Sequence, residues 1–306
     1  MNLEYREADL CGKVLNNRFR LEEKIGSGGM SLLFLSKELS SNEPIVVKIC
    51  KNSHEIKAFQ QEINLLRSLQ HPGIQRVISK GTINGLPYYV SPYYGEINFR
   101  EFLSDKTSLA ENDALQYFLQ IMSAVVYLHK KKILHNDLKP QNILVADESK
   151  LILSDFGLAL HVNRRKYIRN DQESIWGSPV YLAPELPQGF SPSYASDIYS
   201  LGIILFILVI GYPPFYHDDL DILIRMHQTL EPPRPRLLSA SVSQEMESIM
   251  LCAISKSPSD RFANAEEMQD AISSYIKNNQ KKIEKNSFPR RPAMLSFDQE
   301  KTKQIQ

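Results

Sequence analysis

The sequence predicts an α+β protein with a strand-rich N-terminal part and a mainly helical C-terminal part. Before residue 95 most apolar runs are short, alternate as strands do and are separated by turns, whereas later apolar residues recur mostly at helical spacing. The chain has 306 residues, of which 42% are hydrophobic. It can therefore bury a large core, which we expect to form two lobes.

Composition and charge argue against several classes of protein. A formal net charge of +1 gives no support for nucleic acid as the main partner. Cys11, Cys50 and Cys252 are odd in number and widely separated, which indicates neither a disulfide framework nor a zinc site and fits a reducing compartment. Residues 1–7 lack the apolar segment of a secretory signal, and the longest apolar run, 201–210, is too short to span a bilayer. We expect a cytoplasmic protein without a membrane span, with export into another cell as an open alternative.

The first predicted elements are two strands, at 19–25 and 32–35, joined by the glycine-rich turn 26–31. Such a turn between strands lets backbone N–H groups approach phosphates without obstruction by side chains. Taken alone, the glycines fit a plain hairpin equally well. The turn lacks the Gly-Lys-Ser/Thr ending of a P-loop and no helix follows it, which excludes the Walker and Rossmann motifs.

The next strand and helix each carry a charge that requires a partner. The strand at 45–50 places Lys48 on an apolar face, where burial without a partner is unfavourable, although an exposed edge-strand lysine is the alternative. The helix at 54–70 has Glu62 inside its apolar stripe, and a buried carboxylate should be paired. That stripe consists of Phe59, Ile63, Leu66 and Leu69.

The second lobe begins near Glu96, and its first long helix carries an apolar stripe between residues 115 and 126 that we assign to the core. The segment 133–142 follows. It contains Asp137 and Asn142, and after the short buried strand 151–153 comes Asp155. An aspartate that accepts a proton, followed by two oxygen ligands suited to Mg²⁺, has the order and spacing used for phosphoryl transfer to a hydroxyl. An ordinary turn is the alternative, because Asn and Asp favour turns.

These motifs together resemble the protein kinase family over about residues 19 to 278. Lys139-Pro140 after Asp137 is similar to the serine/threonine branch, and the glycine turn resembles that of bacterial eukaryotic-like (Hanks-type) kinases. The resemblance implies the bilobal kinase fold, with an N-lobe at about 19–94 and a C-lobe at about 95–278. It leaves an N-terminal extension, 1–18, and a polar tail, 279–306, that we expect to be disordered.

The resemblance also implies the cofactors, ATP and Mg²⁺, and protein substrates with serine or threonine acceptors. Asp137 takes the role of catalytic base, Lys139 contacts the transferring phosphate, and Asn142 and Asp155 hold Mg²⁺. Lys48 pairs with Glu62 to hold the ATP phosphates. The remaining implied ATP-binding residues are Ile25, Gly26, Ser27, Gly28, Gly29, Leu33, Val46, Pro92 and Tyr94.

Some positions depart from the family pattern. Ser31 replaces the third glycine, and Val46 replaces the alanine beside adenine. Ser91, a small gatekeeper, opens room behind the adenine that Val46 partly takes away, so we expect altered inhibitor selectivity. Asn136 replaces the arginine that normally pairs with a phosphate on the activation loop, so we expect activity without that phosphate.

Residues after the segment 133–142, which resembles the family's catalytic loop, complete the resemblance. Basic residues at 164–169 could favour acidic substrates, although a solvated loop is the commoner explanation. Ser178 stands where threonine is usual, and either hydroxyl could bond Asp137 and Lys139. Asp197 resembles the aspartate that braces the catalytic loop, and Arg261 resembles the arginine that pairs with Glu185.

Two other functions remain as alternatives. A pseudokinase that acts as a scaffold or regulator would account for Asn136, Ser31 and Val46. The catalytic and metal-binding residues are all present, which argues against it. A small-molecule phosphotransferase is disfavoured by the segment 183–185, which matches the end of the family's peptide-docking region. The substrate, the trigger and the oligomeric state do not follow from the sequence.

Overall fold

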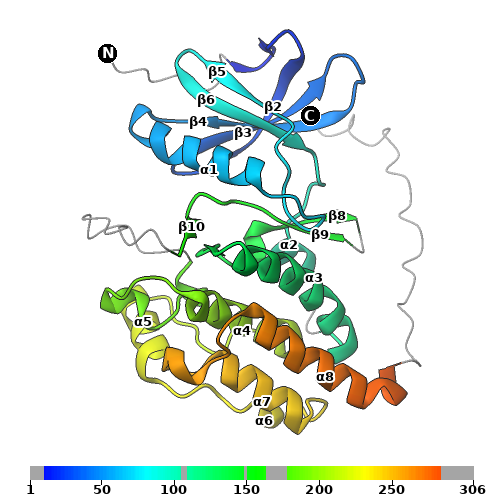
Figure 1. The fold of residues 1–306 in the computed structure, drawn as a ribbon, viewed down its shortest axis with the longest axis vertical. Coiled ribbons are helices and arrows are strands. Elements are labelled where there is room, and N and C mark those ends of the chain that lie inside the picture. The colour runs from blue at the N-terminus through cyan, green and yellow to red at the C-terminus, as the bar shows by residue number, and fades with distance from the viewer. Residues whose placement is uncertain (1–9, 105–108, 148–149, 163–177, 284–306) are drawn as a thin grey trace, which may run out of the picture.

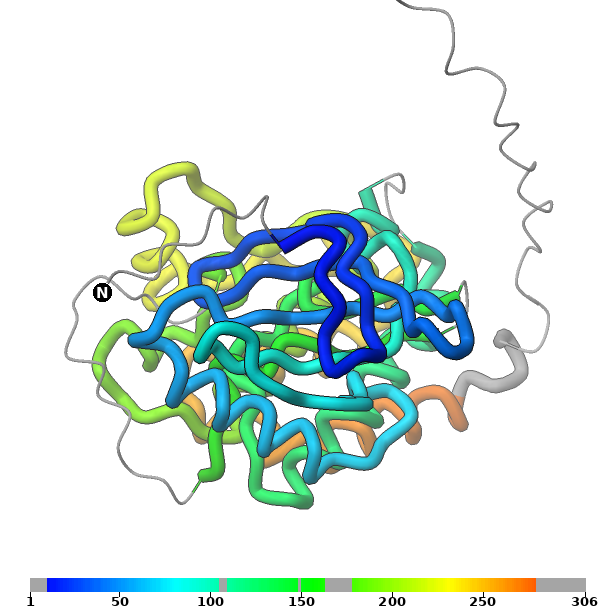
Figure 2. The backbone as a smooth tube through the Cα atoms, turned by 90° about the horizontal axis from the view of Figure 1, so that it is seen from above, coloured from blue at the N-terminus to red at the C-terminus, as the bar shows by residue number. Residues whose placement is uncertain are grey.

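A computed structural model describes residues 10–104, 109–147, 150–162 and 178–283, which form two lobes (Figure 1). The N-terminal lobe is a β-sheet with one long helix, and the C-terminal lobe is mainly helical. Seen from above, the blue and cyan N-terminal lobe overlies the green to orange C-terminal lobe (Figure 2). The expected α+β, bilobal architecture is therefore present.

The N-terminal sheet has six strands in the order β1-β2-β3-β4-β6-β5, and all neighbouring strands are antiparallel. The predicted strands correspond to β2, β3 and β4. Each is longer at one or both ends than the apolar run alone indicated. The strands are β1 (Val14–Leu15), β2 (Phe19–Ser27), β3 (Ser31–Glu38), β4 (Pro44–Cys50), β5 (Ser79–Ile83) and β6 (Leu86–Pro92).

One helix, α1 (Ile56–Ser68), packs against this sheet (Figure 1). A 3₁₀ turn, Ser53–Glu55, precedes it, so the α-helix is shorter than the predicted 54–70. Phe59, Ile63 and Leu66 are buried as predicted, and Glu62 is buried among them with 5% of its surface exposed. The helix therefore places the Glu62 carboxylate in the buried interior of the N-terminal lobe.

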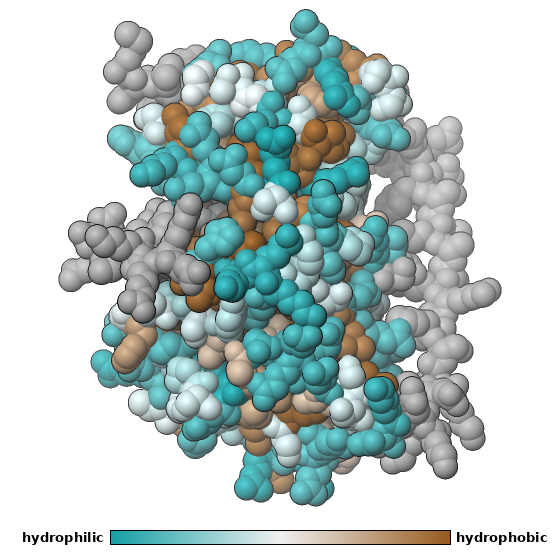
Figure 3. All heavy atoms as spheres, viewed as in Figure 1, coloured by the Kyte–Doolittle hydropathy of each residue, from teal (hydrophilic) through white to brown (hydrophobic). Residues whose placement is uncertain are grey.

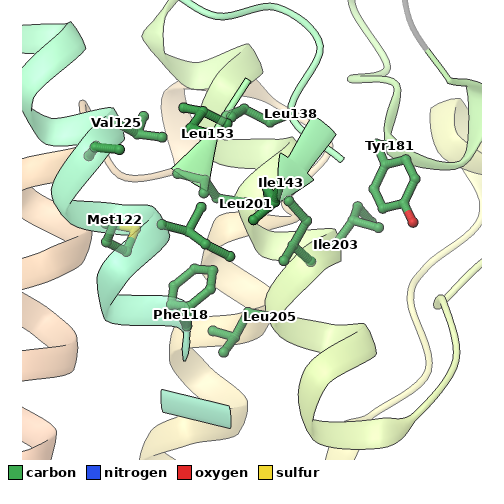
Figure 4. Close-up of a cluster of buried hydrophobic side chains, with 14 of the residues drawn as sticks. Phe118, Met122, Val125, Leu138, Ile143, Leu153, Tyr181, Leu201, Ile203 and Leu205 are labelled. Carbon is green, nitrogen blue, oxygen red and sulfur yellow. The ribbon is translucent and has the colours of Figure 1, made fainter. Parts of the chain in front are cut away.

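The C-terminal lobe is built around α4, which contains the buried run predicted at 201–210. Ser193 and Ser196 form a capping box at its start, and Gly211, with φ of 96°, ends it in the left-handed conformation. Side chains of α3 and α4 meet those from the catalytic loop in one apolar core (Figure 4). The helices are α2 (Phe99–Ser104), α3 (Glu111–Lys130), α4 (Tyr194–Ile210), α5 (Leu220–Thr229), α6 (Pro235–Leu238), α7 (Gln244–Ala253) and α8 (Ala265–Ile283).

Two short antiparallel ribbons frame the catalytic loop. The strand β7 (Ile133–Leu134) precedes the loop and pairs with β10 (Leu160–His161). The strands β8 (Ile143–Asp147) and β9 (Lys150–Leu153) follow it and pair with each other. Residues 135–142 and 154–159 are thus fixed at both ends by backbone hydrogen bonds.

The boundaries of the folded part differ from the expected ones. Within the predicted N-terminal extension, β1 pairs with β2, and Leu10 and Leu15 are buried in the core of the N-terminal lobe. The last helix continues to Ile283, so the predicted tail begins inside α8, and residues 284–306 lie outside the described part. In the described ranges, no helix combines the length and apolar character needed to cross a membrane.

Candidate active site

A cleft of about 460 Å³ is lined by residues of both lobes, from β2, β3, β4, β6, α1 and the loops around β8 and β9. This volume lies in the range of small-molecule sites. Apolar side chains show at the waist of the molecule, on a surface that is otherwise mostly hydrophilic (Figure 3). The site therefore combines an apolar wall with the charged groups described next.

Most of the residues predicted to bind ATP and Mg²⁺ line this cleft. Gly26 and Ser27 lie at the end of β2 and are not among its lining residues, and Asp137 and Lys139 lie beside it. The residues that do line it are Ile25, Gly28, Gly29, Leu33, Val46, Lys48, Glu62, Pro92, Tyr94, Asn142 and Asp155. The turn after β2 is closed by a hydrogen bond from the Gly28 N–H to the Ser31 carbonyl oxygen at 2.9 Å.

Lys48 joins the two lobes at the base of the cleft. Its Nζ donates to Glu62 Oε1 at 2.8 Å and to Asp155 Oδ1 at 3.1 Å. Burial alone would lower the pKa of Lys48, but the carboxylates, Glu62 above all, raise that pKa well above its ordinary value. The Lys48 ammonium in turn lowers the pKa of Asp155. The lysine is therefore charged and the Asp155 carboxyl ionised, as phosphate and metal binding require.

Asp137 is bound by two side chains of its own loop. Lys139 Nζ donates to Asp137 Oδ2 at 2.8 Å, and Asn142 Nδ2 donates to the same oxygen at 2.7 Å. Because the amide nitrogen of Asn142 is used in this way, its Oδ1 is available as a metal ligand. The predicted proton acceptor and one predicted Mg²⁺ ligand are thus in direct contact.

The donor set of the cleft fits ATP with Mg²⁺. Asn142 and Asp155 both line it and supply hard oxygen ligands, which suit a metal that takes its other ligands from phosphates and water. In the described ranges, no group of three or more His, Cys, Asp and Glu side chains could hold a metal by itself.

Hydrogen bonds to Asp197 on α4 hold the backbone of the predicted catalytic loop, residues 135–142. Asp197 Oδ2 accepts from the His135 N–H, and Oδ1 accepts from the Asn136 N–H, both at 3.0 Å. His129 Nε2 lies 3.0 Å from Oδ2 as well. Asp197 is only 1% exposed, so these donors supply the hydrogen bonds that a buried carboxylate needs. The predicted bracing role matches this geometry, and His129 is a member of the network that sequence reasoning missed.

His135 anchors the loop and does not face the cleft. Its side chain is fully buried, its Nε2 lies 3.2 Å from the Ser154 carbonyl oxygen, and its Nδ1 lies 3.3 Å from the Asp137 N–H. The ring also packs edge-on against Phe156, with centroids 4.8 Å apart. Burial lowers the pKa of His135, so it is neutral near pH 7. His135 therefore holds the loop through hydrogen bonds and ring packing.

Asn136 makes a contact that its sequence position alone does not reveal. Its backbone has φ of 61°, in the left-handed region that Asn tolerates better than most residues. Its Nδ2 donates to the Leu158 carbonyl oxygen at 3.0 Å, which ties the catalytic loop to the segment that follows Asp155. The replacement for the expected arginine thus holds this segment by a direct hydrogen bond.

The space behind the predicted adenine pocket is more polar than expected. Ser91 is 1% exposed and lies opposite Val46 in the β4–β6 register, and its Oγ accepts from Gln75 Nε2 at 3.1 Å. Tyr89, on the same face of β6, donates from its hydroxyl to Glu62 Oε1 at 3.0 Å. Sequence reasoning assigned no role to Gln75 or Tyr89. The two-residue spacing of Tyr89 and Ser91 was the signal that could have placed both side chains in the cleft.

The segment that follows Asp155 and ends with the predicted peptide-docking residues 183–185 is only partly described. The basic residues Arg164, Arg165, Lys166 and Arg169 lie outside the described residues. Ser178 and Asp137 line one small cavity, and in the described residues the Ser178 hydroxyl does not make the hydrogen bond to Asp137 or Lys139 that the sequence allowed. The pair of Arg261 and Glu185 is present, with two hydrogen bonds of 2.9 and 3.0 Å.

The chain belongs to the protein kinase family. The family model described as the protein kinase domain matches residues 19–273. The chain is 32% identical over 268 residues to the serine/threonine-protein kinase PrkC of Bacillus subtilis, covering 86% of this chain and 41% of that protein. It is 30% identical over 304 residues to the serine/threonine-protein kinase pkn3 of Myxococcus xanthus, covering 94% of this chain and 55% of that protein.

A third relative gives the same result. The chain is 29% identical over 267 residues to the probable serine/threonine-protein kinase PknB of Lactococcus lactis, covering 85% of this chain and 42% of that protein. The chain thus spans less than two thirds of the length of each of these relatives. The resemblance to bacterial serine/threonine kinases and the bilobal kinase fold expected from the sequence are confirmed.

Proposed function

We propose that this chain is a serine/threonine protein kinase that transfers the γ-phosphate of ATP to hydroxyl groups of protein substrates. The observation that carries the proposal is the contact of Lys48 with both Glu62 and Asp155. It joins the phosphate-binding pair of the N-terminal lobe to a predicted metal ligand of the C-terminal lobe. Membership of the family and the names of the relatives support the same activity.

The proposal gives each of the predicted polar site residues a role. Lys48, oriented by Glu62, binds phosphate oxygens of the nucleotide, and Asn142 and Asp155 hold Mg²⁺. Mg²⁺, when bound, neutralises charge on the phosphates and so favours attack on the γ-phosphate. Asp137 orients the attacking hydroxyl and accepts its proton, while Lys139, which lies 2.8 Å from Asp137, stabilises negative charge on the transferring group.

The test is transfer of labelled phosphate from ATP, with Mg²⁺, to the chain itself and to generic protein substrates. Asp137→Asn removes the proton acceptor and should lower the rate by about 10²- to 10⁴-fold. Lys48→Ala should abolish transfer by removing the phosphate contact. Lys57→Ala is the matched control, because Lys57 is an exposed lysine on α1. Circular dichroism of each variant checks that it is folded.

The outcomes separate the kinase from its alternative. Transfer to serine or threonine that Asp137→Asn slows by this factor, that Lys48→Ala abolishes and that Lys57→Ala retains supports the proposal. A folded wild-type chain that transfers no phosphate to any substrate, with Mg²⁺ or Mn²⁺, would overturn it and favour the pseudokinase.

A further inference from the structure

Side chains of two strands, Lys48 of β4 and Tyr89 of β6, meet the carboxylate of Glu62 on α1, and Tyr89 has no assigned role. Glu62 Oε1 accepts from Lys48 Nζ of β4 at 2.8 Å and from the Tyr89 hydroxyl of β6 at 3.0 Å. Tyr89 is 0% exposed, and Glu62 is 5% exposed. A carboxylate so deeply buried needs at least two strong donors, and the tyrosine supplies the second.

The hydroxyl of Tyr89 acts as a donor and not as an acceptor. Burial raises the pKa of Tyr89 well above its ordinary value, and the neighbouring Glu62 carboxylate raises it further. The phenol therefore stays protonated at any pH at which the protein works. It donates to Glu62 Oε1, and a hydrogen bond to a carboxylate is stronger than one between neutral groups.

The sheet register explains why Tyr89 reaches Glu62. Tyr89 lies directly opposite Lys48 in the antiparallel pairing of β4 and β6, so both side chains project from the same face of the sheet toward α1. The Tyr89 ring also packs against Phe59, on the same helix as Glu62, with centroids 5.7 Å apart. The tyrosine thus contacts α1 twice, by its ring and by its hydroxyl.

The two donors to Glu62 differ in what else they do. Lys48 also contacts Asp155 and, in the proposed function, the nucleotide phosphates, so its three N–H donors are shared among several acceptors. The Tyr89 hydroxyl has one donor, and that donor is committed to Glu62. The hydrogen bond from β6 to α1 therefore does not compete with the nucleotide for a donor.

We infer that Tyr89 is a positioning residue that holds Glu62 in the orientation in which it binds Lys48. This rests on the proposed function of Lys48 in binding ATP. The hydroxyl performs the positioning, and the ring contributes core packing.

Tyr89→Phe tests the inference because it deletes the hydroxyl and keeps the ring. The KM for ATP should rise roughly tenfold, as expected for a lost hydrogen bond to a charged group. The KM for the protein substrate should not change, and a purely structural role would not produce this split. In a Glu62→Ala background, which removes the acceptor, the same substitution should have little further effect, because the two residues act through one contact.

Tyr88→Phe is the matched control on the neighbouring position of the same strand. Tyr88 is also 0% exposed, but it lies on the opposite face of β6, against Gly81 of β5, where a Cβ added at Gly81 would be 2.6 Å from the Tyr88 hydroxyl. Its substitution should leave the KM for ATP unchanged. An ATP KM in Tyr89→Phe equal to that of the wild type or of Tyr88→Phe overturns the inference.

The inference and the proposed function fail separately. A wild-type chain that transfers no phosphate contradicts the proposed function, and calorimetric titration with ATP and Mg²⁺ then decides the inference. Weaker binding by Tyr89→Phe than by Tyr88→Phe supports it. Equal binding by the two variants, or no binding by the wild type, overturns it.

Discussion

Arg261 binds Glu185 through two parallel hydrogen bonds, from Nη1 to Oε1 at 3.0 Å and from Nη2 to Oε2 at 2.9 Å. The arginine side chain is 0% exposed, and that of the glutamate is 9% exposed. Ser196 donates a further hydrogen bond to Glu185 Oε1 at 2.8 Å. The other donors of Arg261 bind the carbonyl oxygens of Ala195, Ser255 and Lys256. The pair therefore joins the segment that follows Asp155 and ends at Glu185 to α4 and to the loop before α8.

Arg261→Ala should destabilise the protein by about 3–5 kcal/mol, because it leaves the Glu185 carboxylate buried without its charged partner. Unfolding in urea, followed by circular dichroism, measures this free energy. Arg18→Ala is the control, because Arg18 also pairs with a glutamate, Glu38, but its side chain is 49% exposed. The control should lose much less, because water and salt screen an exposed ion pair. Equal, small losses in both variants would contradict the buried pair.

Transfer of phosphate should not require a phosphate on the activation loop. The chain has Asn136 in place of the usual arginine, and Asn136 binds the Leu158 carbonyl oxygen directly at 3.0 Å. We expect a chain treated with phosphatase, and freed of phosphate as judged by mass spectrometry, to retain its initial rate. Loss of activity on this treatment, with recovery on rephosphorylation, would refute the prediction.

Two substitutions of Asn136 separate its backbone from its side chain. Asn136→Gly accepts the φ of 61° and loses only the hydrogen bond to Leu158. Asn136→Ala loses the same hydrogen bond and adds strain of roughly 1–2 kcal/mol in the left-handed conformation. We expect alanine to lower the unfolding free energy and kcat more than glycine does. If Asn136→Gly instead lowers the unfolding free energy and kcat more than Asn136→Ala does, the backbone conformation at residue 136 is not the constraint.

Lys48 and Glu62 show which parts of the site can be predicted from the sequence. Each is a charge on an apolar face, and the unfavourable burial of an unpaired charge leads to the expectation of a partner without any knowledge of the tertiary structure. The buried helix at 201–210 follows from composition in the same way. Short-range patterns thus identified several of the elements and several of the charged residues that they carry.

Tyr89 and Gln75 show which parts cannot. Their contacts depend on β6 pairing with β4 across the sheet, although β5 comes between them in the chain, and on a register that places Tyr89 opposite Lys48. The two-residue spacing of Tyr89 and Ser91 places both on one face of their strand, but it does not show which strand pairs with β6. The extent of α8 was missed for a related reason, because the polar residues after Lys277 carry no apolar periodicity and yet continue the helix to Ile283.

Inhibitors with a bulky group directed behind the adenine should bind the wild-type chain, because the gatekeeper Ser91 is small. Ser91→Met fills this space and should weaken their binding by about 1–3 kcal/mol. Gln75→Ala should strengthen it, because Gln75, which lines the cleft and donates to Ser91, occupies part of the same space. Competition against labelled ATP measures these affinities. An identical response of the wild type and Ser91→Met would contradict the prediction.

The unfolding free energy should fall in mild acid because His227 is buried as the neutral form. Burial, and then the nearby Lys256 ammonium, lower the pKa of His227 from 6.5 to about 3. Its Nδ1 lies 2.8 Å from the Tyr199 hydroxyl, and the side chain is enclosed within the C-terminal lobe. Between pH 6.5 and pH 3 the unfolded chain therefore binds a proton that the folded chain does not. Stability falls as the pH falls through this window, by about 1.4 kcal/mol per pH unit.

His227→Gln removes this titration and keeps a polar group beside Tyr199. We expect the loss of unfolding free energy between pH 7 and pH 5 to be smaller in this variant than in the wild type by about 2 kcal/mol, measured by urea unfolding at each pH. The buried His135 titrates in the same direction in both proteins, so its effect cancels in the difference. His54→Gln, at an exposed position before α1, is the control and should keep the wild-type dependence on pH. A His227→Gln protein with the full wild-type loss would show that the histidine is not held neutral.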